Sequence, residues 1–420
     1  MKSSEYSGFY KLSVADRMKE VAEFAGLTDE ETKVLSDPAS LGVEMADHMI
    51  ENVIGRFSLP MGVALNFLVN GKDYLVPMVG EEASVVAAAS HAAKLARPAG
   101  GFSASNTGSI MIAQVQLIDV ADPFAAKLKI LENRQRIMDA CNEKDPVLVN
   151  FGGGMVDVEV RVLDSRVGPM VIVHLKVNTL DAMGANAVNT MAEAVAPMLA
   201  EITGGTAYLR ILSNLAVHRL ARSRCVIKKE ALGGEEVVDK ILVAYAFAAA
   251  DPFRAATNNK GIMNGITPIV LATGNDTRAI ESGCHAYAAR SGTYTSLTTW
   301  EKTRDGDLAG SIEVPMAVGL VGGATKIHPA AKVAVKILGV KSAAELGEVI
   351  ASVGLAQNLG AIKALATEGI QRGHMSLHAR NLASTVGAKG DMLEKIVAQM
   401  IKDGKVRMEY ARELFDKFSK

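Results

Sequence analysis

The spacing of hydrophobic and polar residues predicts helices at the start and in the middle of the chain. Apolar positions recur every three or four residues over 15–35 and again over 41–53, which is the period of an amphipathic helix. A further helix is expected over 240–250, whereas the stretch 251–275 is rich in glycine, asparagine and threonine. We therefore interpret the surroundings of Lys260, within that stretch, as a loop.

A hairpin and a strand-to-helix junction follow the first helices. Strand-like runs over 62–69 and 74–79 flank Asn70-Gly71, a dipeptide that favours a two-residue turn because both positions tolerate a positive φ. Residues 80–84 (GEEAS) come next and lead into a small-residue helix over 85–95. The two carboxylates are therefore expected beside a helix N-terminus, which stabilises negative charge.

Residues 109–213 carry the most regular pattern in the chain. The predicted elements, in chain order, are a strand at 110–120, a helix at 123–142, strands at 156–162 and 169–177, a helix at 186–202 and a strand at 207–212. This β-α-β-β-α-β order is that of the ferredoxin-like split βαβ unit. We therefore expect a self-contained domain inserted in the chain.

Composition and charge exclude several classes of function. The 420 residues suggest two or three domains, and 45 Lys and Arg against 46 Asp and Glu give a net charge of −1. No general field therefore attracts nucleic acid or an anionic membrane. The apolar run 314–325 is too short to span a bilayer, and the N-terminus lacks the apolar core of a signal peptide. With three cysteines far apart, we expect a soluble cytoplasmic protein.

A search for nucleotide and metal motifs finds no match. The chain has neither a G-x-G-x-x-G fingerprint after a strand nor a Walker A loop. His374 and His378 lie four residues apart, but no third ligand is near them in the sequence. No metal site is therefore expected.

Four polar residues in small or apolar surroundings are candidates for chemistry. A lysine flanked by glycines and amides, such as Lys260, can direct its ammonium at a developing oxyanion, or it can be a surface lysine. Asp276 has the position of a helix N-cap, Glu82 that of a first-turn helix acid, and His374 that of a residue closing a helix. The local sequence leaves both interpretations open for each residue.

The segment 181–186 (DAMGAN) opens a helix directly after a strand. Free backbone N–H groups at such a junction suit a pyrophosphate, and Gly184 allows a ligand to approach closely. A capped helix with a small-residue packing face explains the same residues equally well.

A series of runs, in order along almost the whole chain, carries a resemblance to one enzyme family. The runs are 51–55 (ENVIG), 80–90 (GEEASVVAAAS), 181–186 (DAMGAN), 189–197 (NTMAEAVAP), 210–216 (RILSNLA), 251–266 (DPFRAATNNKGIMNGI), 272–276 (ATGND), 296–302 (SLTTWEK), 318–326 (VGLVGGATK), 353–361 (VGLAQNLGA) and 368–380 (EGIQRGHMSLHAR). In these runs the chain resembles class II 3-hydroxy-3-methylglutaryl-CoA (HMG-CoA) reductases.

The resemblance implies an α+β fold with three parts. A large mixed α/β domain, residues 1–108 and 214–371, binds HMG-CoA and dimerises. The inserted ferredoxin-like unit, 109–213, is then the small NAD(P)-binding domain, in line with the missing G-x-G-x-x-G. Residues 372–420 form a mobile helical flap. The implied assembly is a homodimer, or a group of dimers, with shared active sites.

The implied reaction interconverts HMG-CoA and mevalonate plus CoA by two hydride transfers with a nicotinamide cofactor. By similarity, Lys260 stabilises the oxyanion formed when hydride reaches the thioester carbonyl. His374 protonates the departing CoA thiolate, and Glu82 takes part in proton transfer. Asp276 orients these groups and couples their charges. The resemblance leaves the direction in the cell open between mevalonate synthesis and mevalonate degradation.

Further residues match the family's ligand contacts. The substrate contacts fall on Ser84, Asn214, Arg254, Asn264 and Gln357. The cofactor contacts fall on Asp145, Asp181, Met183, Gly184 and Asn186. Arg254 can grip the HMG carboxylate in bidentate fashion. One departure concerns the CoA phosphates, because the family's N-terminal basic residue aligns with Tyr10, and Lys11 is displaced by one.

The choice of cofactor depends on Asp145. It matches a position where an aspartate hydrogen-bonds a ribose 2′-OH and repels a 2′-phosphate. NAD(H) is therefore predicted over NADP(H), and dual use stays open because the neighbouring Lys144 offsets part of that repulsion.

Two other classes of function are alternatives to an oxidoreductase. Replacement of any of the four predicted catalytic residues would favour a non-catalytic acyl-CoA- or nucleotide-binding regulator. The chain keeps all four. A CoA-thioester lyase or hydrolase needs a nucleophile or a metal cluster, for which the sequence offers no motif.

Overall fold

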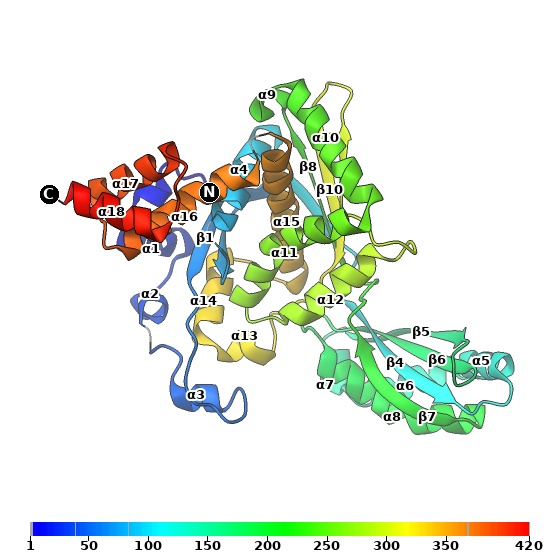
Figure 1. Cartoon of the computed structure of the whole chain (residues 1–420). Coiled ribbons are helices and arrows are strands. Elements are labelled where there is room, and N and C mark those ends of the chain that lie inside the picture. The colour runs from blue at the N-terminus through cyan, green and yellow to red at the C-terminus, as the bar shows by residue number, and fades with distance from the viewer. Residues whose placement is uncertain (1–2, 38, 83, 368, 420) are drawn as a thin grey trace.

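The computed structural model describes residues 3–37, 39–82, 84–367 and 369–419, and their side chains except those of 324 and 370–377. It contains a six-stranded and a four-stranded sheet with many helices (Figure 1), which confirms the α+β class. The four-stranded sheet and its helices form a lobe at the lower right of Figure 1, and the C-terminal helices form another at the left. The division into domains at particular residues stays a prediction.

The six-stranded sheet has the order β2-β1-β3-β8-β10-β9. Its strands are β1 (Met61–Val69), β2 (Lys72–Val79), β3 (Phe102–Asn106), β8 (Leu220–Ile227), β9 (Thr298–Lys302) and β10 (Leu308–Pro315). The predicted hairpin is confirmed, because β1 and β2 pair across Asn70 and Gly71, whose φ angles of 50° and 76° suit a type I′ turn. One row across the sheet places Phe102, Cys225 and Trp300 on the buried face.

Helix α15 (Ala343–Ala366) runs through the interior of the large lobe (Figure 1). By length and composition it is apolar enough to cross a membrane, but 67% of that apolar window is buried in the protein, as in a core helix. The helices around it are α4 (Val85–Ala96), α9 (Lys229–Leu232), α10 (Glu235–Ala250), α11 (Pro252–Ala272), α12 (Thr277–Ala288), α13 (Gly323–Ile327) and α14 (Pro329–Leu338).

Glycines let α11 and α15 pack closely. A Cβ at Gly265 would lie 2.8 Å from Gln357 Cβ and 2.9 Å from the Val353 carbonyl oxygen. A Cβ at Gly354 would lie 2.9 Å from Ile266 Cγ1. Any larger residue at these two positions therefore forces the helices apart.

The four-stranded sheet has the order β5-β6-β4-β7, with every pair antiparallel. Its strands are β4 (Ile110–Ile118), β5 (Gly154–Leu163), β6 (Met170–Asn178) and β7 (Thr206–Ser213), and its helices are α5 (Pro123–Glu132), α6 (Arg134–Asn142), α7 (Pro146–Asn150) and α8 (Ala185–Thr203). The chain therefore runs strand, helices, strand, strand, helix, strand, as in a split βαβ unit. The single helix predicted over 123–142 is two helices, which meet at Asn133.

The two ends of the chain are helical. The helix predicted over 15–35 is divided into α1 (Val14–Ala25) and α2 (Asp29–Ser36), because Gly26 ends α1 in a left-handed conformation. Helix α3 (Val43–Asp47) covers only part of the predicted 41–53. At the other end, α16 (Ile370–Thr385), α17 (Gly390–Lys402) and α18 (Met408–Phe418) pack around a buried cluster of their own.

The packing of Trp300 on Gly310 generates a prediction about stability. A Cβ at Gly310 would lie 2.1 Å from the indole Cζ3, and the indole is held because its Nε1 donates to Asn358 Oδ1 at 2.7 Å. We expect Gly310→Ala to lower the free energy of unfolding by about 1–3 kcal/mol, measured by chemical denaturation. Gly261→Ala is the control, since no atom lies within 4 Å of a Cβ there and alanine favours a helix. Equal stability of G310A and the wild type would contradict this packing.

Candidate active site

Lys260 lies on a helix, so the predicted loop is wrong. Helix α11 begins directly after Asp251 in the sequence. The Asp251 carboxylate caps the helix by accepting a hydrogen bond from the Arg254 backbone N–H at 2.9 Å. Asparagine, glycine and threonine are weak helix formers, and local propensity therefore argues against a helix here. The stabilisation comes instead from tertiary contacts of the two asparagines before the lysine.

Those asparagines, Asn258 and Asn259, are buried and bonded to other segments. Asn259 Nδ2 donates to the Thr295 carbonyl at 2.8 Å, and Asn258 Oδ1 accepts from Asn358 Nδ2 of α15 at 2.9 Å. Leaving such a buried group unpaired costs about 1–3 kcal/mol. The bonds therefore hold α11 in place and fix the backbone that presents the exposed Lys260.

Glu81 lies at the junction of β2 and α4, directly before Glu82. Burial raises the pKa of Glu81, and the charges of Glu82 and Glu281 raise it further. The Glu82 backbone N–H and the Lys260 charge oppose this rise. Glu82 and Lys260 therefore both act on the charge of Glu81. The charge of Glu281 also acts on Glu81. The sequence analysis assigned no role to Glu281 or to Glu81.

Asp276 caps α12, in agreement with one of its two predicted roles. Its Oδ1 accepts from the backbone N–H groups of Arg278 at 2.9 Å and Ala279 at 3.1 Å. Ala272, the last residue of α11, comes 12 residues after Lys260, which is about 18 Å of helix. Among the described residues no contact joins Asp276 to Lys260; within one chain Lys260 lies near the middle of α11, and Asp276 follows its C-terminal end.

The predicted cofactor turn, 181–184, lies beside Asp276. A Cβ at Gly319 would lie 2.5 Å from the Met183 backbone nitrogen, so this glycine allows the two segments to touch. The Gly319 N–H donates to Asn275 Oδ1 at 2.7 Å, and Asn275 directly precedes the aspartate. A single glycine therefore connects the turn to the start of α12.

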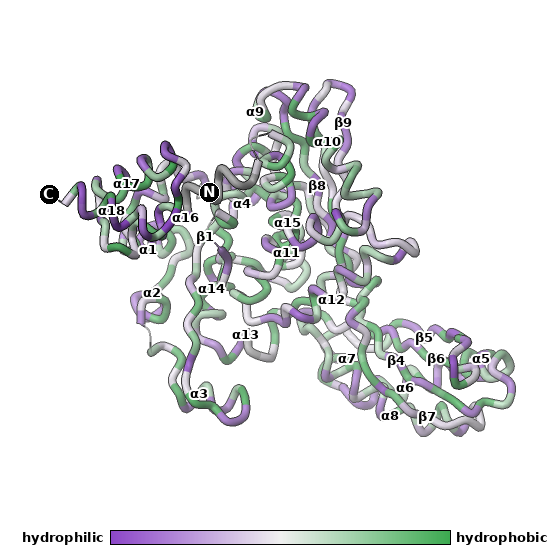
Figure 2. The backbone as a smooth tube through the Cα atoms, in the orientation of Figure 1, coloured by the Kyte–Doolittle hydropathy of each residue, from purple (hydrophilic) through white to green (hydrophobic). Residues whose placement is uncertain are grey.

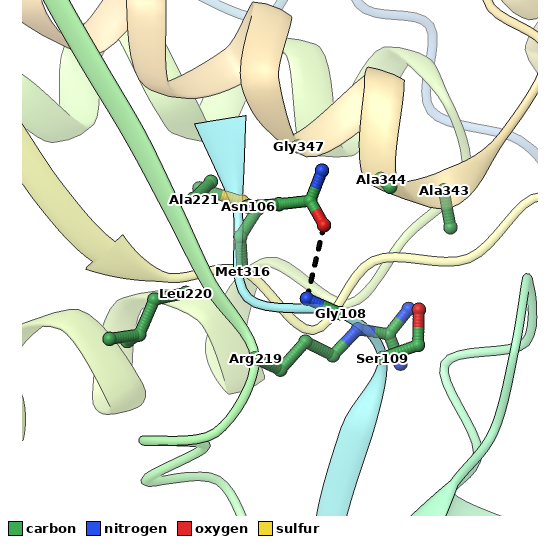
Figure 3. A pocket seen from close by; sticks show the side chains of 10 residues that line it. All are labelled: Asn106, Gly108, Ser109, Arg219, Leu220, Ala221, Met316, Ala343, Ala344 and Gly347. Atoms are coloured by element: carbon green, nitrogen blue, oxygen red, sulfur yellow. Dashed lines mark hydrogen bonds between the residues drawn. The ribbon is translucent and has the colours of Figure 1, made fainter. Parts of the chain in front are cut away.

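Arg219 holds this turn by hydrogen bonds. It is only 4% exposed, and its guanidinium donates to Thr179 Oγ1 at 3.0 Å and to the carbonyls of Ala182 at 2.9 Å and Val318 at 2.5 Å. Its side chain also lines the small hollow shown in Figure 3. Burial lowers the pKa of Arg219 to about 10, and the Asp181 charge opposes this. The hollow at this junction measures about 10 Å³, which admits no ligand larger than a water.

The start of α8 has the form of an anion site. Gly184 has a φ of 94°, and a Cβ there would lie 2.3 Å from Thr179 Cγ2, so only glycine fits. No side chain caps the first turn of α8, which contains Asn186. Its N–H groups therefore suit a phosphate. Asp181 ties the turn to α15 by accepting from the Ala343 N–H at 2.7 Å.

Asp145 lies beyond the helix predicted over 123–142 and caps a separate helix, α7. Its Oδ1 accepts from the Leu148 N–H at 2.9 Å. A Cβ at Gly153 would lie 2.6 Å from Leu148 Cδ1 and 2.7 Å from the Asn178 carbonyl oxygen. Helix α7 therefore lies beside the strand end that leads into the cofactor turn.

Two predicted substrate residues carry polar groups without protein partners. Gln357 is 5% exposed, and its buried Oε1 finds no hydrogen-bond donor in the described part of the chain. Burial lowers the pKa of the half-buried Arg254, whose guanidinium donates to none of the described residues. Such groups are costly unless a ligand pairs with them.

The other predicted substrate residues lie around α11 and α12. Asn264 is four residues after Lys260 and shares its helix face. Ser84 begins α4 with a φ of 86°, an unusual value for a side-chain-bearing residue that marks local strain. The Asn214 carbonyl lies against Gly283 of α12, where a Cβ would come within 2.5 Å.

His374 lies in α16, and its side chain is outside the described residues. Among the residues that are described, no group of three or more His, Cys, Asp or Glu is placed to hold a metal ion.

Comparison with known proteins places this architecture in a family. A family model for hydroxymethylglutaryl-coenzyme A reductase matches residues 13–379. A 3-hydroxy-3-methylglutaryl-coenzyme A reductase from Archaeoglobus fulgidus is 60% identical over 99% of this chain and 95% of its own. A probable one from Borreliella burgdorferi is 36% identical over 81% and 79%.

Solved structures agree. The class II 3-hydroxy-3-methylglutaryl-CoA reductase from Streptococcus pneumoniae, bound to NADPH in open conformations, is 40% identical and superimposes with a TM-score of 0.83 over 97% of this chain and 100% of that one. A second structure of the Streptococcus pneumoniae enzyme gives a TM-score of 0.85 over 99% and 100%. The chain therefore belongs to the HMG-CoA reductase family of oxidoreductases.

Proposed function

We propose that this chain interconverts HMG-CoA and mevalonate plus CoA, with the predicted residues in their predicted roles. The observation that carries the proposal is the contact of the turn 181–184 with Gly319 and Asn275, beside Asp276. A nicotinamide cofactor supplies or accepts hydride when bound. The uncapped start of α8 suits its pyrophosphate, and Asp181, Met183, Gly184 and Asn186 surround that start.

The substrate residues supply groups that fit HMG-CoA. The partly buried Arg254 guanidinium suits the HMG carboxylate, and the unpaired Gln357 Oε1 suits its hydroxyl. Asn264, Ser84 and Asn214 complete the set on neighbouring elements. Lys260, on the same helix face as Asn264, stabilises the oxyanion, and Glu82 transfers protons beside it.

The active sites are shared between two chains of a homodimer. Within one chain about 18 Å of helix separates Lys260 from the C-terminal end of α11, beyond which Asp276 lies, so a partner's Asp276 can complete the site. The segment around α3 projects from the large lobe (Figure 1), and parts of its backbone are coloured hydrophobic in Figure 2. Its side chains Ile50, Ile54 and Phe57 are 67%, 103% and 89% exposed, which supports this pairing. Exposed apolar patches of this kind mark interaction sites.

The proposed cofactor is NAD(H), used in the cytoplasm. Asp145 caps α7, the helix beside the strand end that leads into the cofactor turn, and its carboxylate suits a ribose 2′-OH. A structural relative binds NADPH, however, and Lys144 next to Asp145 offers a positive charge for a 2′-phosphate. NADH and NADPH are therefore compared in the same assay.

The function and the cofactor preference are tested together by following nicotinamide absorbance with HMG-CoA. We expect turnover with both cofactors and a higher kcat/KM with NADH. Asp145→Asn should reduce that preference, because it removes the charge that repels a 2′-phosphate. A preference for NADPH in the wild type would overturn the role of Asp145 but keep the reductase. No turnover by the folded dimer would overturn the proposed function.

Lys260→Ala tests oxyanion stabilisation. We expect kcat to fall by about 10²–10³ or more, because a preorganised positive group at the developing charge is lost. HMG-CoA binding, measured by calorimetry, should remain, since Arg254 and Gln357 are unchanged. The comparison variant is Lys326→Ala, which removes the lysine at the end of the run 318–326. Normal turnover in K260A would exclude the assigned role.

His374→Gln tests thiolate protonation. The variant should still reduce free mevaldehyde, because no thiolate leaves in that step, but should fail to reduce HMG-CoA. Steady-state rates with the two substrates give the comparison. Equal impairment with both substrates would remove His374 from this role.

A further inference from the structure

A hollow of about 510 Å³ opens on the outer face of the six-stranded sheet. Helix α15 covers the inner face, where Ser223 Oγ of β8 lies 2.9 Å from Ser352 Oγ. Side chains alternate between the two faces of a strand, so Arg222 and Arg224 lie on the outer face and line the hollow. Its volume is in the range of small-ligand sites, and none of the residues assigned above to substrate, cofactor or catalysis lines it.

One row of the sheet surrounds Arg224 with hydroxyl groups. The register places Arg224 directly between Ser103 of β3 and Ser311 of β10, and Ser311 pairs in turn with Thr299 of β9. Cross-strand neighbours of this kind have Cβ atoms about 4.5–5.5 Å apart. Within the part of the chain that the structure describes, no side chain or carbonyl pairs with the Arg224 guanidinium or with these three hydroxyls. All four groups are therefore available to a ligand.

Two further arginines line the hollow, and both are held by protein contacts. Arg222 Nε donates to Glu313 Oε2 at 2.5 Å, and the Tyr287 hydroxyl donates to Glu313 Oε1. The Arg290 guanidinium carbon lies 3.9 Å from the centroid of the Tyr287 ring, and its Nη1 donates to the Tyr287 carbonyl at 3.0 Å. Glu313 thus compensates one of the three positive charges, and two remain.

These groups match the chemistry of a phosphate ester. A guanidinium fits two phosphate oxygens at once, and hydroxyls donate to the remaining oxygens. A phosphomonoester carries a charge of about −1.5 to −2 at pH 7, which balances the two uncompensated positive charges. Because the hollow exceeds the size of a single phosphate group, the ester also has room for an organic part.

We propose that this hollow is a second ligand site, which binds a small organic phosphomonoester by its phosphate group. Arg224 contacts the phosphate in bidentate fashion, Ser103 and Ser311 donate to its oxygens, and Arg290 supplies the second charge. The site is separate from the proposed active site, and its existence does not depend on the proposed reaction.

The floor of the hollow is bonded to the helix that carries Lys260. Ser296 Oγ accepts from Asn258 Nδ2 at 2.9 Å, and the Leu297 N–H donates to Asn259 Oδ1 at 3.1 Å. Both Ser296 and Leu297 line the hollow. A ligand bound there therefore stabilises the segment that supports α11, since binding to the folded state alone raises its stability.

Phenyl phosphate is the probe, and two related anions serve as its controls. Inorganic phosphate has the charge without an organic part, and phenyl sulfate has a similar shape with a single negative charge. Calorimetry with the folded full chain should give tighter binding of phenyl phosphate than of either control. Its affinity should increase as the pH rises through about 6, because the ester gains its second charge there while the guanidiniums stay charged.

Variants locate the probe in the hollow. Arg224→Ala should weaken binding about tenfold or more, because a hydrogen-bonded charge is lost, and Ser311→Ala should weaken it less. Glu313→Gln should strengthen binding about twofold or more, because it removes the negative charge of the lining. Damage to the fold would not produce such a gain. Arg166→Ala, at an exposed arginine in the turn between β5 and β6, is the matched control and should bind as the wild type does.

Hydrogen exchange gives a second, independent readout. Phenyl phosphate should slow the exchange of backbone amides over 295–297 in the wild type and not in R224A. Exchange that is unchanged in this segment of a protein that binds the probe would place the probe elsewhere and overturn the proposal.

Absence of phenyl phosphate binding, or equal binding by R224A and the wild type, would also overturn it. Equal affinity for phenyl phosphate and either control anion would contradict the proposed ligand class. Displacement of the probe by CoA, which itself carries a phosphomonoester, would assign the hollow to the substrate and remove the second site. Binding by a protein that does not turn over HMG-CoA would support this site and contradict the proposed function instead.

Discussion

The close packing of α11 on α15 is the constraint on which the site depends. Gly265 and Gly354 allow the two helices to touch, and Asn258 and Asn358 join them by a buried hydrogen bond. Because neither helix can shift without opening a void or breaking that bond, α11 holds its functional side chains at fixed helical spacing. A flexible loop, which the local sequence favours, would leave the ammonium of Lys260 without a fixed position.

A second constraint connects the two sheets. Arg219 is a buried cation whose partners are carbonyls and a hydroxyl of the cofactor turn and of Val318. It is paired because a buried guanidinium without acceptors is strongly destabilising. Together with the Gly319 contact, it fixes the start of α8 relative to α12. The lobe that contains α8 is thus attached to the large lobe directly beside the start of α12.

Local patterns predicted the parts whose stability is local. The Asn70-Gly71 hairpin, the Asp276 cap and the β-α-β-β-α-β order were all readable, because turn residues, caps and period-two strands act over a few residues. Helix α11 was missed, since its stability comes from partners about forty to a hundred residues away, such as Thr295 and Asn358. Glu281 was missed for a related reason. Its relation to Glu81 exists only once α11 and α12 lie side by side, although its spacing from Asp276 already placed it on a helix.

We propose that one site, built on α11, carries out two reductions on a single substrate. The stoichiometry tests this proposal: nicotinamide oxidised, CoA thiol released and mevalonate formed are counted in one limiting-substrate reaction with HMG-CoA. We expect two nicotinamides oxidised and one thiol released for each mevalonate. One nicotinamide per thiol, with mevaldehyde accumulating, would contradict it, because the aldehyde would then leave the site before the second hydride transfer.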